Sequence, residues 1–129
     1  AQEFNGELIC ADSWTVRRRM DIGTAKPSLK EQAMVKHHLL DVVDPEQPYS
    51  AAVFKQQALD VIRDIQERNK LPIMVGGTGL YIDGVIFDYN FLPAGPPGQR
   101  EALELLTREE LLDKIKEQNI DLGNTDTRN

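Results

Sequence analysis

The chain has 129 residues, of which 40% are hydrophobic and 28% charged, and its formal net charge is -6. This composition predicts a globular domain with one core, and it argues against a self-sufficient nucleic-acid-binding protein unless further chain supplies a basic surface. No apolar stretch approaches the roughly 20 residues that cross a bilayer, and no secretory signal is visible, so we expect neither membrane association nor secretion.

The first predicted element is a strand over Glu7–Asp12, because this apolar run is continuous, as in strands buried on both faces of a parallel sheet. Cys10 lies inside it and is interpreted as a buried small hydrophobe. As a lone cysteine it cannot form an internal disulfide, which favours a cytoplasmic protein. Asp12 and Ser13 follow at the strand tip, where open α/β sheets bind ligands. The pair is therefore a candidate site, although Asp-Ser also suits an ordinary turn or helix cap.

The next stretch is ambiguous in its chemistry. Trp14 has no clear pattern around it, and three successive basic residues such as Arg17–Arg19 usually form a solvated face. Met20–Pro27 is too polar for a strand and contains glycine. A helix is expected directly after Ser28, because Glu31 lies three residues on, which is the spacing of a capping box.

The second strand is expected over Leu39–Val43. His37 and His38 precede it. Two histidines without a cysteine or a spaced carboxylate make a poor metal site, so a structural or solvated role is expected for them. The sequence does not identify metal ligands.

An amphipathic helix is expected after Ser50, which suits the N-cap. Its apolar stripe has helical spacing and consists of Phe54, Ala58, Val61, Ile62 and Ile65. The helix should end near Asn69, before Pro72. A third strand follows over Leu71–Val75, and strand, helix, strand in this order predicts a crossover unit of an α/β fold.

Glycines follow the third strand, in the order Gly76, Gly77, Thr78, Gly79, and open a further helical pattern. Glycines at this place let backbone N–H groups approach an anion at a helix N-terminus, and the Thr78 hydroxyl can bond to a phosphate oxygen. A tight strand-to-helix turn with Thr78 as the helix cap explains the same residues equally well.

Residues 91–98 read FLPAGPPG, a cluster that breaks regular structure and predicts the passage into a helical insertion. A helix is expected after Thr107, with Glu110 completing a second capping box. Residues 121–129 are polar, and we expect the chain to be the central part of a longer protein.

Five ordered blocks of this sequence closely resemble the tRNA dimethylallyltransferase family. They are ADS at 11–13, MDIGTAKP at 20–27, HHLLDVVDP at 37–45, YSAAVF at 49–54 and LPIMVGGTGLYI at 71–82. The resemblance covers roughly residues 5–100, and MDIGTAK with VGGTGLY is far more specific than a lone glycine-rich loop.

The resemblance implies an α/β fold with a parallel sheet of the P-loop nucleoside-triphosphate-hydrolase type. Residues 1–92 would form part of the catalytic core, and residues 93–129 the start of a helical tRNA-binding insertion. The implied reaction transfers a dimethylallyl group from dimethylallyl diphosphate to N6 of adenine 37 in tRNAs that read codons beginning with U. Mg²⁺ would accompany the diphosphate. The implied partners are tRNA and dimethylallyl diphosphate, and the complete cytoplasmic enzyme would be a monomer.

The resemblance also assigns roles to residues. Asp12 matches the general base that accepts a proton from the attacking amine, and Thr78 matches the threonine near the scissile oxygen. Both would be catalytic. The tRNA-contacting set would be Asp12, Ser13, Trp14, Thr15, Thr78 and Arg100. The diphosphate would be bound by Gly76, Gly77 and Thr78.

Two departures from the family are visible. The glycine-rich phosphate loop, the arginine-containing segment after the insertion and the later basic helices are absent from this chain, so we expect it to bind neither diphosphate nor tRNA well by itself. The chain also has Thr15-Val16-Arg17-Arg18-Arg19 where the family usually has a Gln-hydrophobic-Tyr-basic-Gly stretch. Arg19 in place of glycine would strain a turn if its φ were positive.

Two alternatives stay open at this point. The chain could belong to a small-molecule kinase of the same fold that uses ATP, or it could be a truncated, non-catalytic interaction module, which its acidic charge and missing phosphate loop would suit. A truncated parallel sheet would also expose apolar edges and favour aggregation.

Overall fold

The computed structural model describes residues 1–92 and 95–123. The chain divides into two compact units, Ala1–Phe91 and Leu92–Asn129, which are described separately. Of the polar residues 121–129, those from 124 onward lie outside the described part, as do residues 93 and 94 of the Pro/Gly cluster. In the described part, no helix has both the length and the apolar character needed to cross a membrane.

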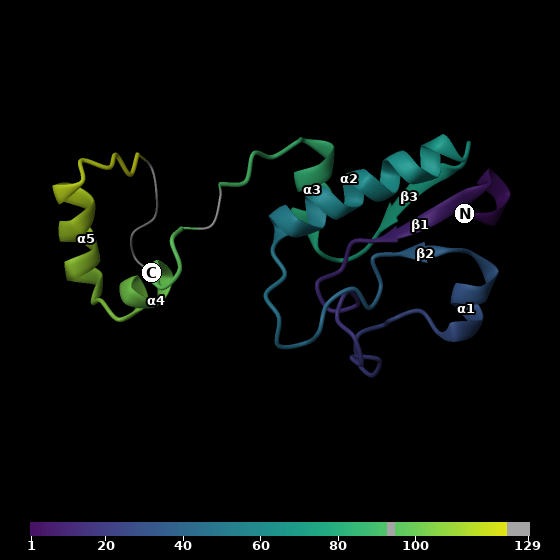
Figure 1. Ribbon diagram of the computed structural model, residues 1–129, viewed down its shortest axis with the longest axis horizontal. Helices are drawn as coiled ribbons and strands as arrows, with labels where there is room; N and C mark the ends of the chain where they lie inside the picture. The colour runs from purple at the N-terminus through teal and green to yellow at the C-terminus, as the bar shows by residue number, and fades with distance from the viewer. Residues whose placement is uncertain (93–94, 124–129) are drawn as a thin grey trace. The chain divides into compact units, whose positions relative to one another are not determined.

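The first unit is built on a parallel sheet of three strands in the order β2-β1-β3 (Figure 1). The strands are β1 (Gly6–Cys10), β2 (His37–His38) and β3 (Leu71–Val75). In the central pair, Leu8 of β1 lies opposite Ile73 of β3. The predicted parallel sheet is confirmed, and β3 has the predicted bounds.

The second strand was expected over Leu39–Val43, and this prediction is wrong: the strand is formed by His37 and His38. Leu39 and Asp41 have positive φ angles of 59° and 53°, which a strand cannot contain. The segment bonds instead to the chain that follows β1, for example through the Val42 N–H, which donates to the Val16 carbonyl at 2.8 Å. Leu39 and Val43 are buried all the same. Their apolar character thus reflects burial in a loop.

The helix expected after Ser50 is α2 (Ala51–Glu67), and the Ser50 side chain accepts from the Val53 N–H as predicted. Its last residue is Glu67, and the C-cap Arg68 is followed by Asn69, which has a positive φ of 55°. α2 packs against β1, β3 and α3 (Gly79–Ile86) (Figure 1). Its buried face joins the core, whose buried members are Ile9, Ala11, Leu39, Phe54, Ala58, Ile65 and Tyr81.

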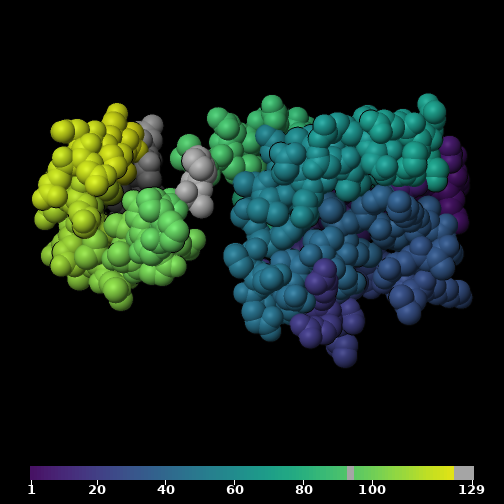
Figure 2. All heavy atoms as spheres, viewed as in Figure 1, coloured from purple at the N-terminus to yellow at the C-terminus, as the bar shows by residue number. Residues whose placement is uncertain are grey.

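Shorter elements complete the unit. A 3-10 helix, η1 (Gln2–Phe4), precedes β1, and α1 (Leu29–Met34) precedes β2. The capping box predicted at the start of α1 is present. Part of the loop between β1 and α1, violet in Figures 1 and 2, projects from the surface of this unit.

One carboxylate is buried in the sheet. Glu7 of β1 is only 2% exposed, and it accepts from Arg68 Nη2 at 2.8 Å and Lys70 Nζ at 2.8 Å and contacts His38 Nε2 at 2.7 Å. The Arg68 hydrogen bonds hold the Glu7 pKa well below its usual range, against the effect of burial, with Lys70 and His38 adding to the shift. The structural role expected of the histidine pair is confirmed for His38.

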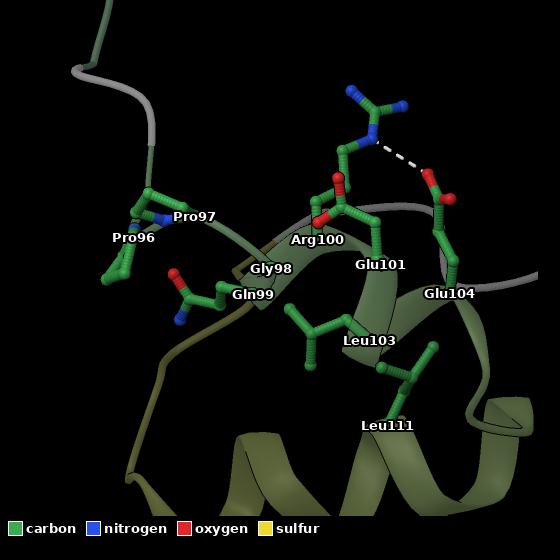
Figure 3. Close-up of a pocket in the computed structure, with 10 residues that line it drawn as sticks. Pro96, Pro97, Gly98, Gln99, Arg100, Glu101, Leu103, Glu104 and Leu111 are labelled. Carbon is green, nitrogen blue, oxygen red and sulfur yellow. Dashed lines mark hydrogen bonds and ion pairs between the residues drawn. The ribbon is translucent and has the colours of Figure 1, made fainter.

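The second unit contains α4 (Gln99–Glu104) and α5 (Arg108–Glu117). Thr107 and Glu110 form the predicted capping box at the start of α5. Leu103 of α4 lies beside Leu111 of α5 along an open cavity of about 700 Å³ (Figure 3).

Candidate active site

Asp12 and Thr78 follow two neighbouring parallel strands, β1 and β3, at their carboxyl ends. The Ser13 backbone N–H donates to Thr78 Oγ1 at 2.9 Å, and the Thr78 N–H donates to the Ala11 carbonyl at 3.1 Å. The turns after the two strands are thus joined in both directions. Two residues that lie far apart in the sequence share one edge of the sheet, which is where such folds bind ligands.

The Asp12 carboxylate is held by its own turn. Oδ1 accepts from the Trp14 N–H at 2.9 Å and the Thr15 N–H at 3.1 Å. The turn-forming role considered for Asp12 is therefore confirmed, and the turn uses only one of the two carboxylate oxygens. In the described part of the chain no donor bonds to Oδ2, so this oxygen is available to a ligand while Oδ1 fixes its direction.

Thr78 occupies the N-cap position of α3, but its side chain makes no capping hydrogen bond. The alternative of a strand-to-helix turn with Thr78 as the helix cap is confirmed in position, although the Thr78 hydroxyl does not bond to the helix. Its oxygen accepts the Ser13 N–H instead. A hydroxyl that accepts in this way still has its own proton to donate, so Thr78 can act as a donor at the sheet edge.

Gly76 has a steric reason to be glycine. A Cβ at this position would lie 2.1 Å from the Ala11 carbonyl oxygen, so a side chain would push the two turns apart. At Gly77 a Cβ would lie 3.2 Å from Asp12 Oδ2. Glycine at this position therefore leaves space beside the free carboxylate oxygen. Their binding of diphosphate stays a prediction, and the close approach alone accounts for Gly76.

A cavity of about 250 Å³ opens beside Asp12. Strand residues Cys10 and Val75 line it together with the loop residues Thr24, Ala25 and Pro27. Cys10 is buried as predicted, and burial, with a smaller effect of the Asp12 charge, raises its pKa to about 11. Its thiol is therefore protonated at neutral pH and is no nucleophile.

The remaining predicted contact residues of this unit differ in exposure. Trp14 is 57% exposed, whereas Thr15 is buried and its Oγ1 donates to the Asp12 carbonyl at 3.5 Å. Ser13 is half-buried and faces Thr78 through its backbone. Trp14 thus offers a surface to a ligand, and Thr15 supports the Asp12 turn.

The run Arg17–Arg19 is only partly the solvated face that was predicted. Arg17 is half-buried, and its Nη1 donates to the Pro45 carbonyl at 2.7 Å. Arg18 and Arg19 are exposed, and each lies 3.6 Å from the Asp44 carboxylate. Arg19 has a φ of 60°, so the positive backbone angle considered from the family's glycine is present.

Lys26 has a role that sequence reasoning missed. Its side chain is only 4% exposed, and its ammonium bonds to Asp21, Asp41 and the Arg17 carbonyl. The motif Met20–Pro27 was recognised as a block, but nothing in its spacing indicated a buried cation.

Arg100 belongs to the second unit. It lies on α4, where its Nε donates to Glu104 Oε1 at 2.8 Å (Figure 3). This hydrogen bond and the Glu104 charge raise the Arg100 pKa above its ordinary value. The side chain is well exposed, so its guanidinium keeps free donors for a substrate.

Within residues 1–92 and 95–123, no group of three or more His, Cys, Asp or Glu side chains has the arrangement of a metal site. Asp12 is a single carboxylate with one oxygen already engaged. The described residues therefore provide no ligand set of their own for a metal, and the Mg²⁺ expected to accompany the diphosphate stays a prediction.

Comparison with known proteins identifies the family. The model of the IPP transferase family matches residues 15–125. The chain is 48% identical over 126 residues to the tRNA dimethylallyltransferase of Streptococcus uberis, an alignment that covers 95% of this chain and 42% of the relative. It is 48% identical over 95 residues to that of Pelotomaculum thermopropionicum, which covers 74% of this chain and 30% of the relative.

Solved structures agree. The full-length tRNA isopentenylpyrophosphate transferase from Bacillus halodurans superposes with a TM-score of 0.69 at 41% identity, over 91% of this chain and 40% of that one. A eukaryotic dimethylallyltransferase acting on tRNA gives a TM-score of 0.74 at 31% identity, over 90% and 30%. The predicted P-loop nucleoside-triphosphate-hydrolase type of fold is confirmed by these neighbours. The chain spans less than half the length of these relatives and belongs to the IPP transferase family.

Proposed function

We propose that this chain is the part of a tRNA dimethylallyltransferase that carries the general base and a donor to the leaving diphosphate. The complete protein would transfer the dimethylallyl group of dimethylallyl diphosphate to N6 of adenine 37 in tRNAs that read codons beginning with U. Family membership and the names of the relatives support the reaction class. The observation that carries the proposal is the hydrogen bond from the Ser13 N–H to Thr78 Oγ1, which ties the turn that contains Asp12 to Thr78.

In this proposal Asp12 Oδ2 accepts a proton from the adenine amine as the nitrogen bonds to the allylic carbon. The Trp14 and Thr15 N–H groups hold Oδ1, and this keeps Oδ2 directed at the adenine amine. The exposed Trp14 ring offers a stacking surface for the extruded base. Ser13 and Thr15 hold this segment in place.

The bond from the allylic carbon to the diphosphate oxygen breaks in the same step, and its electron pair leaves with the diphosphate. The Thr78 hydroxyl donates a hydrogen bond to a departing oxygen as charge develops there, which lowers the barrier more than it stabilises the bound substrate. Backbone N–H groups at Gly76 and Gly77 would bind the same negative charge, and Arg100 would contact the tRNA. Mg²⁺, held through the diphosphate, would neutralise part of it.

A transfer assay with the complete protein tests the proposal. The expected result is incorporation of labelled allyl group into tRNA from dimethylallyl diphosphate. Dimethylallyl diphosphate, and not ATP, should also raise the unfolding temperature, because a ligand that binds only the folded state stabilises it. Protection by ATP alone, with phosphoryl transfer to a small molecule, would establish a kinase instead. We expect a monomeric, cytoplasmic enzyme, which sedimentation and fractionation would check.

A further inference from the structure

We propose that Lys26 is a positioning residue for the Asp12 site, because its buried ammonium fixes the loops that form one wall of the cavity at Asp12. This inference rests on the function proposed above, since it concerns the same site.

The Lys26 ammonium joins three segments of the chain at one nitrogen. Nζ donates to the Arg17 carbonyl at 2.8 Å, to Asp21 Oδ1 at 2.8 Å and to Asp41 Oδ1 at 2.7 Å. An ammonium has three donors, so all of them are used. The Lys26 side chain is almost fully buried, whereas both carboxylates remain partly exposed.

The electrostatics keep this group charged. Burial lowers the Lys26 pKa, but the hydrogen bonds and charges of Asp21 and Asp41 outweigh burial and raise it above its ordinary value. The ammonium is therefore charged wherever the protein is folded at neutral pH. A neutral side chain at this position would leave the Arg17 carbonyl without its donor and the two carboxylates without their cation.

The loops joined by Lys26 have an unfavourable backbone. Positive φ angles occur at Arg19 (60°), Ala25 (53°), Leu39 (59°) and Asp41 (53°). Such angles are costly for residues with a Cβ and persist only where surrounding contacts impose them. Lys26 directly follows Ala25 and bonds to Asp41. It therefore helps to hold the positive φ angle of each of these two residues in place.

The same contacts lead to the candidate site. Thr24, Ala25 and Pro27, the neighbours of Lys26, line the cavity beside Asp12. On the other side, the Arg17 carbonyl lies two residues beyond Thr15, whose N–H holds Asp12 Oδ1. Loss of the ammonium would release both the cavity wall and the segment that orients the carboxylate.

The test compares Lys26→Met, Lys26→Arg and a control, Lys55→Met, in the complete protein. Lys55 of α2 is also largely buried and ion-paired, donating to Asp88 Oδ1 and to the Tyr89 carbonyl, and none of these residues lines the cavity. Each variant is assayed below its own unfolding temperature. The kcat and the KM values for tRNA and for dimethylallyl diphosphate are measured separately.

For Lys26→Met we expect kcat to fall roughly tenfold to a hundredfold, as for a small displacement of reacting groups, with little change in the KM for dimethylallyl diphosphate. Lys26→Arg keeps the charge and donors and should recover part of the loss. Lys55→Met should leave kcat within about twofold, as for a distant site. Equal losses of kcat in Lys26→Met and Lys55→Met, or no recovery in Lys26→Arg, would overturn the inference.

Amide hydrogen exchange gives a readout that does not depend on activity. In Lys26→Met the Trp14 and Thr15 amides should exchange about tenfold faster or more, because local opening becomes easier, whereas Lys55→Met should not affect them. Unchanged exchange at both amides would contradict the positioning role. Absence of allyl transfer by the unmodified protein, with exchange altered as expected, would instead contradict the proposed function alone.

Discussion

The backbone N–H of Ser13 donates to the side-chain hydroxyl of Thr78 at 2.9 Å, across 65 residues of sequence. This bond decides the direction of the Thr78 hydroxyl, because one lone pair is occupied and the proton is left for another acceptor. It also relates the two strand tips that carry the proposed catalytic residues.

Replacing Thr78 by valine removes both the acceptor for the Ser13 N–H and the proposed donor to the leaving group. Transfer of the allyl group should slow by roughly 10²- to 10³-fold, the usual effect of losing one preorganised donor. Thr78→Ser keeps the hydroxyl and serves as the matched control, with a much smaller loss. Single-turnover rates would measure the chemical step, and equal rates for the two variants would remove the proposed donor role.

Asp12→Asn tests the general base with little disturbance of the turn. The amide oxygen can still accept from the N–H groups of Trp14 and Thr15, so the unfolding temperature should stay within a few degrees. The nitrogen cannot take the proton, and the transfer rate should fall by about 10²- to 10⁴-fold. A rate within about tenfold of the unmodified enzyme would show that another group is the base.

Gly76→Ala should destabilise the first unit, because its Cβ would meet the Ala11 carbonyl oxygen at 2.1 Å. Backbone shifts of this kind cost about 1–3 kcal/mol. Gly79→Ala is the control, since nothing lies within 4 Å of a Cβ there and the position begins α3. Urea unfolding would compare the two, and we expect Gly79→Ala to be neutral or stabilising by up to about 1 kcal/mol.

The buried Glu7 carboxylate should make stability depend on pH in acid. Its pKa in the folded protein is lowered from an ordinary value of 4.5, chiefly by the Arg68 hydrogen bonds. Its contribution is therefore complete above pH 4.5 and is lost as the pH falls through the lower, folded-state value. Removing the Glu7 charge should lower the free energy of unfolding by roughly 1–3 kcal/mol at neutral pH. The loss should lie toward the lower end of this range, because Arg68 and Lys70 are partly solvated.

Unfolding temperatures of the unmodified protein and Glu7→Gln, measured from neutral to acid pH, would test this. The variant should be less stable at neutral pH and should lose less stability on acidification. Parallel curves for the two proteins would mean that other carboxylates cause the acid dependence.

Local signals in the sequence were enough for several elements. The Ser50 cap and the stripe that begins at Phe54 predicted α2, and both capping boxes are present where their spacing indicated. These features depend on residues three or four positions apart, which a sequence displays directly. That Asp12 and Thr78 both follow the carboxyl ends of strands in one parallel sheet also agrees with a general rule for such sheets.

Other features depend on contacts between distant segments. The apolar run Leu39–Val43 has the composition of a strand, but the chain after β1 pairs with it in an irregular loop. Nothing in the sequence marked Glu7 or Lys26 as a charge with buried ion-pair partners, and each is held by partners from other parts of the chain. No periodicity in the sequence marks such ion pairs. The sequence therefore indicated candidate site residues, but it did not indicate the buried ion pairs around them.

The buried thiol of Cys10 can be used to measure local unfolding of this chain. The thiol is the chain's single cysteine, and with its burial and a pKa of about 11 we expect it to react slowly with alkylating reagents while β1 is covered. Unfolding would expose it and restore ordinary reactivity, so the labelling rate of this sulfur would measure how often the central strand is uncovered. A second cysteine placed in the projecting loop could then carry a dye without background from the first.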